Sequence, residues 1–215
     1  MAKMDFKGKT IVVSAGGTRE AIDPVRHIGN RSSGKMGHAV AEAARDRGAK
    51  VLLITAPTAL PDPDGIDVTH VESVFEMRDE AIMACRRADA LIMSAAPADF
   101  VPKNPSRQKI KKIQGSLTLE LVKAPDILTE VKDDIIKVGF SAETENLIEN
   151  TKEKLRDKDC DLFVANDVTI AGSGFYADNN KVTLVYKDGN VEDLPMMSKR
   201  EVAEIVLDRV RELMG

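Results

Sequence analysis

Short apolar runs alternate with helical patterns along the chain. Each apolar run predicts a buried strand, and the segments between them repeat apolar residues at helical spacing. In the first half the predicted strands are 10–15, 50–55, 67–71 and 90–94, and the predicted helices are 35–47 and 74–87. Strands and helices that alternate at this rhythm favour an α/β, Rossmann-like three-layer fold with a mostly parallel sheet.

The second half of the chain continues this pattern and then changes it. The next predicted strands are 117–122, 135–140 and 161–165, and the next predicted helices are 125–132 and 146–158. Residues 182–186 and 191–194 flank Lys-Asp-Gly-Asn, which is typical of a β-hairpin turn. Residues 198–214 have the pattern of a capped terminal helix. We therefore expect one domain over residues 1–215, with a C-terminal hairpin and a terminal helix beside the sheet.

A glycine-rich loop, residues 29–37, lies between the first predicted strand and the first predicted helix. Such a loop leaves backbone N–H groups available for an anion, and the helix dipole favours negative charge there. The pattern Gly-x-x-x-x-Gly-Lys resembles the P-loop, but Met36 stands where that motif needs a hydroxyl for Mg²⁺. The loop therefore predicts a phosphate site outside the P-loop class. Its candidate binding residues are Ser32, Ser33, Gly34, Lys35 and Gly37.

Composition narrows the possible functions. The chain has 31 Lys and Arg against 35 Asp and Glu, a net charge of −4, which argues against a dedicated nucleic-acid-binding protein. Cys85, Cys160 and the three His residues show no metal-ligand spacing. No apolar run approaches ~20 residues, and no signal peptide is recognisable. We expect a cytoplasmic protein with no protein-held metal and with neither a membrane nor a nucleic acid as partner.

Polar residues follow the predicted strands at places where an α/β sheet binds ligands. Arg26 suits an anion contact or an ion pair with Asp23, and the ion pair is favoured. The amide of Asn30 is suited to hydrogen-bonding a carbonyl oxygen beside the anion loop. Asp99 follows a predicted strand and is interpreted equally well as a helix cap or as a contact to a ribose hydroxyl.

Two groups of lysines are open to both a structural and a functional interpretation. Residues 102–114 carry two prolines and no clean periodicity, and predict a flexible loop. Its lysines, Lys109 among them, usually form a solvated basic face, but a lid over polyphosphate is a competing interpretation. Lys154 and Lys158 share one helix face at i, i+4, and the pattern by itself favours surface charge.

These segments together resemble phosphopantothenoylcysteine synthetase, the ligase of coenzyme A biosynthesis that most bacteria fuse to a flavin-dependent decarboxylase. The resemblance extends from Gly8 to the terminal helix. It is most specific at 15–37, where the chain reads AGGTREAIDPVRHIGNRSSGKMG. Pro97 and residues 27–29 depart slightly from the family's usual residues. Further blocks that carry the resemblance are 94–100, 109–112, 123–128, 138–144 and 165–167.

The resemblance implies a reaction in two steps. A nucleotide first activates the carboxylate of 4′-phosphopantothenate as an acyl-nucleotidyl anhydride and releases pyrophosphate. The amine of L-cysteine then attacks the acyl carbon, which forms an amide and releases the nucleoside monophosphate. These blocks look like the bacterial and archaeal branch rather than the eukaryotic branch, which uses ATP, so we expect CTP, an acyl-cytidylate and CMP, with Mg²⁺ bound to the nucleotide phosphates. An ATP-using version of the same ligase is the alternative.

The resemblance also implies roles for individual residues. Lys109 neutralises the α-phosphate in the first step. Asn30 holds the acyl carbonyl and supports attack by cysteine, while Arg26 and Ala96 position the intermediate. The residues it implies for nucleotide binding are Asp99 at the ribose, Lys109, Pro125, Asp126, Ile127, Leu128, Phe140, Lys154 and Lys158. Which phosphate the loop at 32–37 binds is left open.

The resemblance extends to partners. It implies a homodimer through the sheet region, and we expect the hairpin at 182–194 to form part of that contact. No flavin-binding segment is recognisable, so we expect no flavin and no decarboxylation by this chain. A separate or fused phosphopantothenoylcysteine decarboxylase is the expected partner, whether this is a free-standing enzyme or a domain of a bifunctional protein.

Two functions of other classes compete with the ligase. A nicotinamide- or flavin-dependent oxidoreductase needs a dinucleotide fingerprint and an acidic residue at the end of the second strand, where residues 55–57 read Thr-Ala-Pro. A non-catalytic nucleotide-binding module leaves Asn30 and Lys109 without a role.

Overall fold

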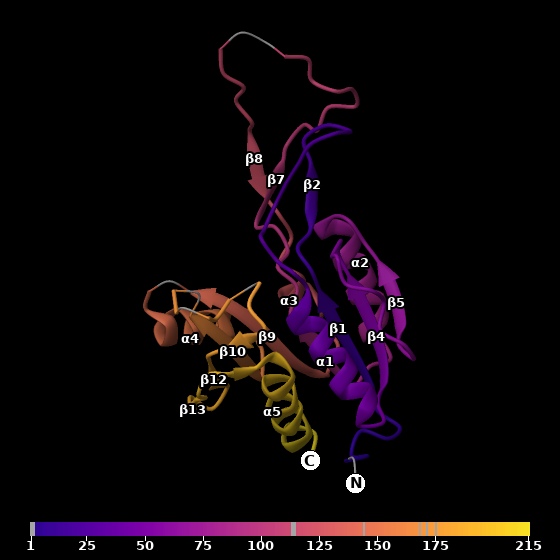
Figure 1. Cartoon of the computed structure of the whole chain (residues 1–215), viewed down its shortest axis with the longest axis vertical. Helices are drawn as coiled ribbons and strands as arrows, with labels where there is room; N and C mark the ends of the chain where they lie inside the picture. Colours follow the sequence, from indigo (N-terminus) through magenta and orange to yellow (C-terminus); the bar gives the residue numbers. More distant parts are fainter. Residues whose placement is uncertain (1–2, 113–114, 144, 168, 171, 175) are drawn as a thin grey trace.

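Eight strands form the central sheet of the computed structural model, which describes residues 3–112, 115–143, 145–167, 169–170, 172–174 and 176–215. In spatial order they are β13 (Val191–Asp193), β12 (Val182–Tyr186), β10 (Leu162–Asp167), β9 (Ile136–Glu143), β6 (Ala90–Met93), β1 (Thr10–Ala15), β4 (Lys50–Thr55) and β5 (Asp67–His70). The strands from β10 to β5 run parallel, and β12 and β13 form an antiparallel hairpin. The predicted mostly parallel sheet and C-terminal hairpin are therefore confirmed (Figure 1).

Helices cover both faces of this sheet and complete the predicted three layers (Figure 1). One face carries α1 (Lys35–Asp46) and α5 (Lys199–Leu213), and the other carries α2 (Val74–Cys85), α3 (Ile127–Glu130) and α4 (Leu147–Asp157). Each face has its own apolar core: Ile11 and Val13 of β1 belong to the core under α1 and α5, whereas Val12 belongs to the other. Alternate strand residues thus serve opposite faces. Within the described ranges, no helix is long and apolar enough to cross a membrane.

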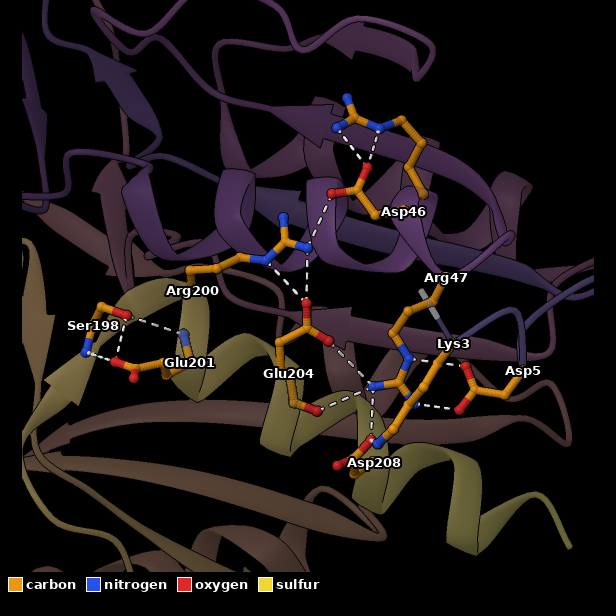
Figure 2. Close-up of polar contacts among 10 residues, drawn as sticks. Lys3, Asp5, Asp46, Arg47, Ser198, Arg200, Glu201, Glu204 and Asp208 are labelled. Carbon is orange, nitrogen blue, oxygen red and sulfur yellow. Dashed lines mark hydrogen bonds and ion pairs between the residues drawn. The ribbon is translucent and has the colours of Figure 1, made fainter. Parts of the chain in front are cut away.

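An ion-pair cluster ties α5 to α1 (Figure 2). Arg47, which follows α1, is 3% exposed. Its guanidinium donates to the carboxylate of Asp5 and lies 2.8 Å from that of Asp208 on α5. Arg200, at the start of α5, pairs with Asp46 at the end of α1. These contacts fix α5 against α1, and they therefore also fix the segment that begins α5.

Two short ribbons rise from the sheet and form a projection that we call the arm, the described residues of 18–29 and 99–123 (Figure 1). β2 (Arg19–Ala21) pairs with β3 (His27–Gly29), and β7 (Phe100–Pro102) pairs with β8 (Leu121–Lys123). The arm carries exposed apolar side chains, of which Phe100 is 54% exposed. It leaves the sheet after β1 and β6, so its base lies at the carboxyl ends of the parallel strands.

Two predicted elements are much shorter than expected. The strand expected at 117–122 is present only as β8, because the alternating Leu117, Leu119 and Leu121 cover no core and are all exposed. The helix expected at 125–132 is reduced to α3, since the chain is extended again at Val131. Of the loop predicted at 102–114, residues 103–112 form neither helix nor strand, Pro102 is the last residue of β7, and residues 113 and 114 lie outside the described residues. The flexibility expected there stays a prediction.

Candidate active site

A cleft of about 420 Å³ opens at the carboxyl ends of the parallel strands. Ligands of open α/β sheets bind at this edge, where the loops after the strands converge. The cleft combines the loop before α1, the segment after β6, the end of β9 and one face of α4. The predicted site residues that line it are Asn30, Ser32, Ser33, Gly34, Lys35, Gly37, Ala96, Asp99, Phe140, Lys154 and Lys158.

The glycine-rich loop presents the N-terminus of α1 to the cleft. Gly34 begins the helix with a φ of 76° and supplies no side-chain cap, so the first-turn N–H groups are not capped by it. Gly37 lets α1 lie directly on β1, because a Cβ at this position would be 2.6 Å from Ser14 O and from Ala15 Cβ. Close packing of helix and strand thus places the positive end of the helix dipole at the cleft.

The segment after β6 is held in place from two sides. The hydroxyl of Ser14 accepts a hydrogen bond from the Ala95 N–H at 3.1 Å, and that of Thr18 accepts one from the Ala98 N–H at 2.9 Å. On the opposite side, Asn30 Nδ2 donates to the carbonyl of Pro97 at 2.8 Å. The Asn30 amide is therefore oriented against this segment, and Ala96 lies between these anchors on the cleft wall.

Asp99 lies at the cleft and caps none of the described helices. It directly precedes β7, and its carbonyl accepts a hydrogen bond from the Ala124 N–H at 2.9 Å. The residue that caps α3 is Asp126. Of the two interpretations that the sequence left open for Asp99, the helix cap is therefore wrong, and the contact to a ribose hydroxyl remains a prediction.

Lys154 and Lys158 extend from one face of α4 into the cleft. Lys154 Nζ lies 2.6 Å from Glu143, and Lys158 Nζ lies 3.0 Å from Asp126. Their side chains are 42% and 28% exposed, so neither is a fully solvated surface charge. Each ammonium is therefore held beside a carboxylate that also offsets part of its charge, and both lysines line the cleft.

Six polar residues of the cleft lie outside the predicted site residues: Arg31, Ser94, Ser141, Asn166, Asn180 and Lys199. Two of them are held by residues nearby in the sequence. Asn166 Oδ1 accepts a hydrogen bond from Ser173 Oγ at 2.9 Å, and Asn180 Oδ1 accepts one from the Gly174 N–H at 3.2 Å. Lys199 is the first residue of α5, where a lysine normally indicates a solvated surface. Asn166 lies within a block that carries the resemblance, but no local pattern marks Asn180 or Lys199.

Arg26 and Lys109 lie on the arm and do not line the cleft. Arg26 pairs with Asp23, whose side chain is fully buried, so the favoured ion pair is confirmed. The Arg26 hydrogen bond, the largest cause, holds the pKa of Asp23 well below its usual range. Arg26 also donates to the carbonyl of Ile110 at 2.9 Å, and the Ile110 N–H donates to Asp23 at 3.0 Å. This cluster anchors the residue next to exposed Lys109.

Residues 125–128 contact the site indirectly. Asp126 is the partner of Lys158, whereas Ile127 and Leu128 are buried in the core on the α2 face. Pro125 is half-buried and is not part of the cleft lining. Their proposed place beside the nucleotide base therefore stays a prediction.

The described part of the chain contains no group of three or more His, Cys, Asp or Glu side chains that could hold a metal. Among the residues that line the cleft, Asp99 is the one carboxylate. Cys85 and Cys160 are buried, and burial raises the pKa of each thiol to about 12, which keeps both protonated. The cleft therefore presents amide, hydroxyl, ammonium and guanidinium groups, the Asp99 carboxylate and the N-terminus of α1.

Comparison with known proteins gives a consistent picture. Residues 6–214 match the family described as DNA/pantothenate metabolism flavoprotein C-terminal domain. The coenzyme A biosynthesis bifunctional protein CoaBC of Bacillus subtilis (strain 168) is 46% identical over 212 residues, which cover 97% of this chain and 52% of that protein. CoaBC of Vibrio cholerae is 42% identical over 213 residues, covering 96% and 53%. The chain thus spans about half the length of the curated relatives it matches.

One solved structure has the same architecture over nearly its whole length. The crystal structure of the C-terminal domain of CoaBC superimposes with a TM-score of 0.84 at 39% identity and covers 99% of this chain and 98% of that one. The fold of this chain is therefore one already known in that domain.

Proposed function

This chain belongs to the family of the DNA/pantothenate metabolism flavoprotein C-terminal domain, and we propose that it is a phosphopantothenate–cysteine ligase of coenzyme A biosynthesis. It joins 4′-phosphopantothenate to L-cysteine through an acyl-cytidylate, consuming CTP and releasing CMP and pyrophosphate. The single observation that carries the proposal is the convergence of the anion loop, Asn30 and the two α4 lysines on one cleft.

Binding of two phosphorylated substrates suits the charges of this cleft. The N-terminus of α1 supplies backbone donors, and Lys154 and Lys158 supply ammonium groups. Phe140 adds an apolar surface of the kind that a base or a pantothenate chain can contact. Mg²⁺ is expected to arrive with the nucleotide and to be held chiefly by its phosphates.

In the first step a carboxylate oxygen of phosphopantothenate attacks the α-phosphorus, and the bond to pyrophosphate breaks. Negative charge accumulates on the α-phosphate, and we assign its neutralisation to Lys109. Since Lys109 is exposed on the arm, this role requires residues 102–114 to approach the cleft when substrates bind. The Arg26–Asp23 cluster holds Ile110 and so limits where Lys109 can go.

In the second step the cysteine amine attacks the acyl carbon, loses a proton, and CMP leaves with the electrons of the acyl–phosphate bond. Charge now develops on the acyl oxygen. Asn30 Nδ2 is an oriented donor at the cleft, and we assign it the acyl carbonyl. In the free protein this amide donates to the Pro97 carbonyl, and in this step it would donate to the acyl oxygen of the substrate instead.

We also propose that two copies of the chain associate. The expected contact through residues 182–194 places β13, an edge strand of the sheet, in the interface. The exposed apolar side chains of the arm are a second surface that a partner copy can cover. Light scattering measures the mass; a monomer at micromolar concentration contradicts the dimer. The other expected partner is a phosphopantothenoylcysteine decarboxylase, and no flavin is assigned to this chain.

Product analysis tests the function directly. The protein is incubated with 4′-phosphopantothenate, L-cysteine, Mg²⁺ and either CTP or ATP, and products are identified by mass spectrometry. Phosphopantothenoylcysteine and CMP from CTP support the proposal. Product that forms only with ATP would support the ligase activity and would identify ATP, not CTP, as the nucleotide. Folded protein that forms no product with either nucleotide contradicts the ligase and favours a non-catalytic nucleotide-binding module.

A further inference from the structure

A lysine that the reaction scheme does not use is buried at the edge of the cleft. Lys199 is 6% exposed and still lines the cleft. Its Nζ donates to the carbonyl of Gly174 at 2.9 Å and to the carbonyl of Ala177. Its backbone N–H donates to the carbonyl of Asp178 at 3.0 Å. Lys199 therefore holds a segment that we call the loop wall, residues 174 and 176–178.

The same wall is tied to the anion loop from the other side. Lys35 Nζ lies 2.6 Å from the Asp178 carboxylate and donates to the Tyr176 carbonyl at 3.2 Å. Asn180, just beyond the wall, accepts from the Gly174 N–H and approaches Met36 of α1. The wall thus connects the start of α5 with the start of α1, and both ends of this connection lie at the cleft.

Two features of the position of Lys199 disfavour its positive charge, and the carbonyls of Gly174 and Ala177 offset part of that cost. Burial removes water from the ammonium, and the first turn of a helix repels positive charge. The charged groups that act on it from the packed elements are Lys35 of α1, which repels it, and Asp178 of the wall, which attracts it. Asp178 is itself 86% exposed and already paired with Lys35. Burial, followed by Lys35, lowers the pKa of Lys199 to about 8.

We propose that Lys199 is a positioning residue for the nucleotide polyphosphate: it holds the loop wall in place and supplies a buried positive charge that the bound anion stabilises. This inference rests on the proposed function, because it requires the cleft to bind a nucleotide. Lys199 makes no contact with the reacting atoms in this account. If Lys199 only held the loop wall in place, its protonation would not change when an anion binds.

A proton linkage follows from this assignment. A bound polyphosphate favours the protonated ammonium and raises the pKa of Lys199 back toward its usual value near 10.5. Near pH 8 a part of the Lys199 side chains is neutral in the free protein, so binding takes up protons there. At pH 6 nearly all are already protonated, and the uptake from this residue vanishes.

Isothermal titration calorimetry with CTP and Mg²⁺ measures this uptake. Titrations at pH 8 and pH 6 in two buffers of different ionisation enthalpy give the number of protons exchanged. The variants are Lys199→Met, which removes the charge, and Lys199→Arg, which keeps it. Lys50→Met is the matched control, because Lys50 lies at the start of β4 with a 66% exposed side chain. Thermal melts establish that each variant is folded.

The proposal predicts that the wild type takes up protons at pH 8 and takes up none at pH 6 beyond the background of the Met variant. Lys199→Met should bind CTP at least about tenfold more weakly and lose the uptake, while Lys199→Arg retains most of the affinity. Wild-type protein that binds CTP without proton uptake overturns the inference even if Lys199→Met fails to fold. Wild-type protein that binds neither CTP nor ATP overturns the proposed function itself, and this inference with it.

Discussion

The cleft and the arm hold their functional side chains in different ways. In the cleft, Asn30 donates to the carbonyl of Pro97, the segment after β6 is held by Ser14 and Thr18, and Gly37 lets α1 lie directly on the sheet. On the arm, Lys109 is exposed and only its neighbour Ile110 is anchored. Under the proposed function this difference amounts to a division of labour: the cleft is organised before substrate arrives, whereas the arm completes the site only after a movement.

The largest expected effect tests the arm. Lys109→Ala removes the cation assigned to the α-phosphate, and we expect the rate of pyrophosphate release to fall ~10²–10³-fold while CTP affinity changes little. Stopped-flow detection of pyrophosphate and calorimetric binding measure the two quantities. Lys103→Ala is the matched control, since Lys103 lies on the same loop but pairs with Glu120. Equal rates for Lys109→Ala and the control would contradict a role of the arm in the active site.

The next effect tests the cleft. Asn30→Ala removes the donor assigned to the acyl oxygen, so we expect pyrophosphate release to continue while amide formation falls ~10²-fold and acyl-cytidylate accumulates. Rapid quench followed by mass spectrometry detects the intermediate, with the exposed hairpin residue Asn190→Ala as control. A variant that forms phosphopantothenoylcysteine at the wild-type rate contradicts the role of Asn30.

A third change tests whether packing creates the anion site. Gly37→Ala favours the helix by up to ~1 kcal/mol, but its Cβ meets backbone and side-chain atoms of β1 at 2.6 Å. We expect the clash to dominate, with a net loss of ~1–3 kcal/mol in the free energy of unfolding and weaker CTP binding. Urea unfolding and calorimetry measure both. Glu42→Ala on the same helix should change neither, and a more stable Gly37→Ala that binds CTP normally contradicts the account.

The smallest effect on the site is expected from a substitution far from both the cleft and the arm. Arg47→Met removes the ion pairs with Asp5 and Asp208 and should lower the free energy of unfolding by about 2 kcal/mol. The loss is no larger because both carboxylates are partly exposed, so water can solvate them once the guanidinium is gone. Binding of CTP should be unchanged. The Arg47 hydrogen bond, the largest cause, holds the pKa of Asp5 below its usual value.

A carboxylate with a depressed folded pKa stabilises the protein above its unfolded pKa near 3.9, and this stability is lost as pH falls through the folded pKa. The stability difference between wild type and Arg47→Met should therefore be constant above about pH 5 and shrink below about pH 4. Urea unfolding at several pH values measures it. A difference that does not change down to pH 3 contradicts the Asp5 assignment.

Much of the fold could be predicted because the core strands are continuous apolar runs and α1 and α5 have strong helical patterns. The strand predicted at 117–122 is wrong in extent: Leu117, Leu119 and Leu121 alternate like a strand with one buried face, but the arm has no core in which to bury them. The helix predicted at 125–132 is too long for a different reason. Ile127 and Leu128 are buried by tertiary packing although they belong to a helix of only four residues.

The candidate site could be predicted only in part. The anion loop has a local signature, so it was found from residues alone. Lys154 and Lys158 look like surface charge in sequence, and their place in the cleft depends on how α4 packs. Lys199 has no local signature, because its partners lie about twenty residues earlier in the chain. Arg26 and Lys109 were assigned by resemblance, and the free protein leaves them outside the cleft.

The measurement that tests the account most directly is pyrophosphate release in the absence of cysteine. Wild-type protein with Mg²⁺, CTP and 4′-phosphopantothenate should release one burst of pyrophosphate, about one per active site, and retain acyl-cytidylate until cysteine is added. That result means that arm and cleft together perform the first step. Folded protein that binds CTP but releases no pyrophosphate until cysteine is present would contradict an activated acyl intermediate and the division of labour built on it.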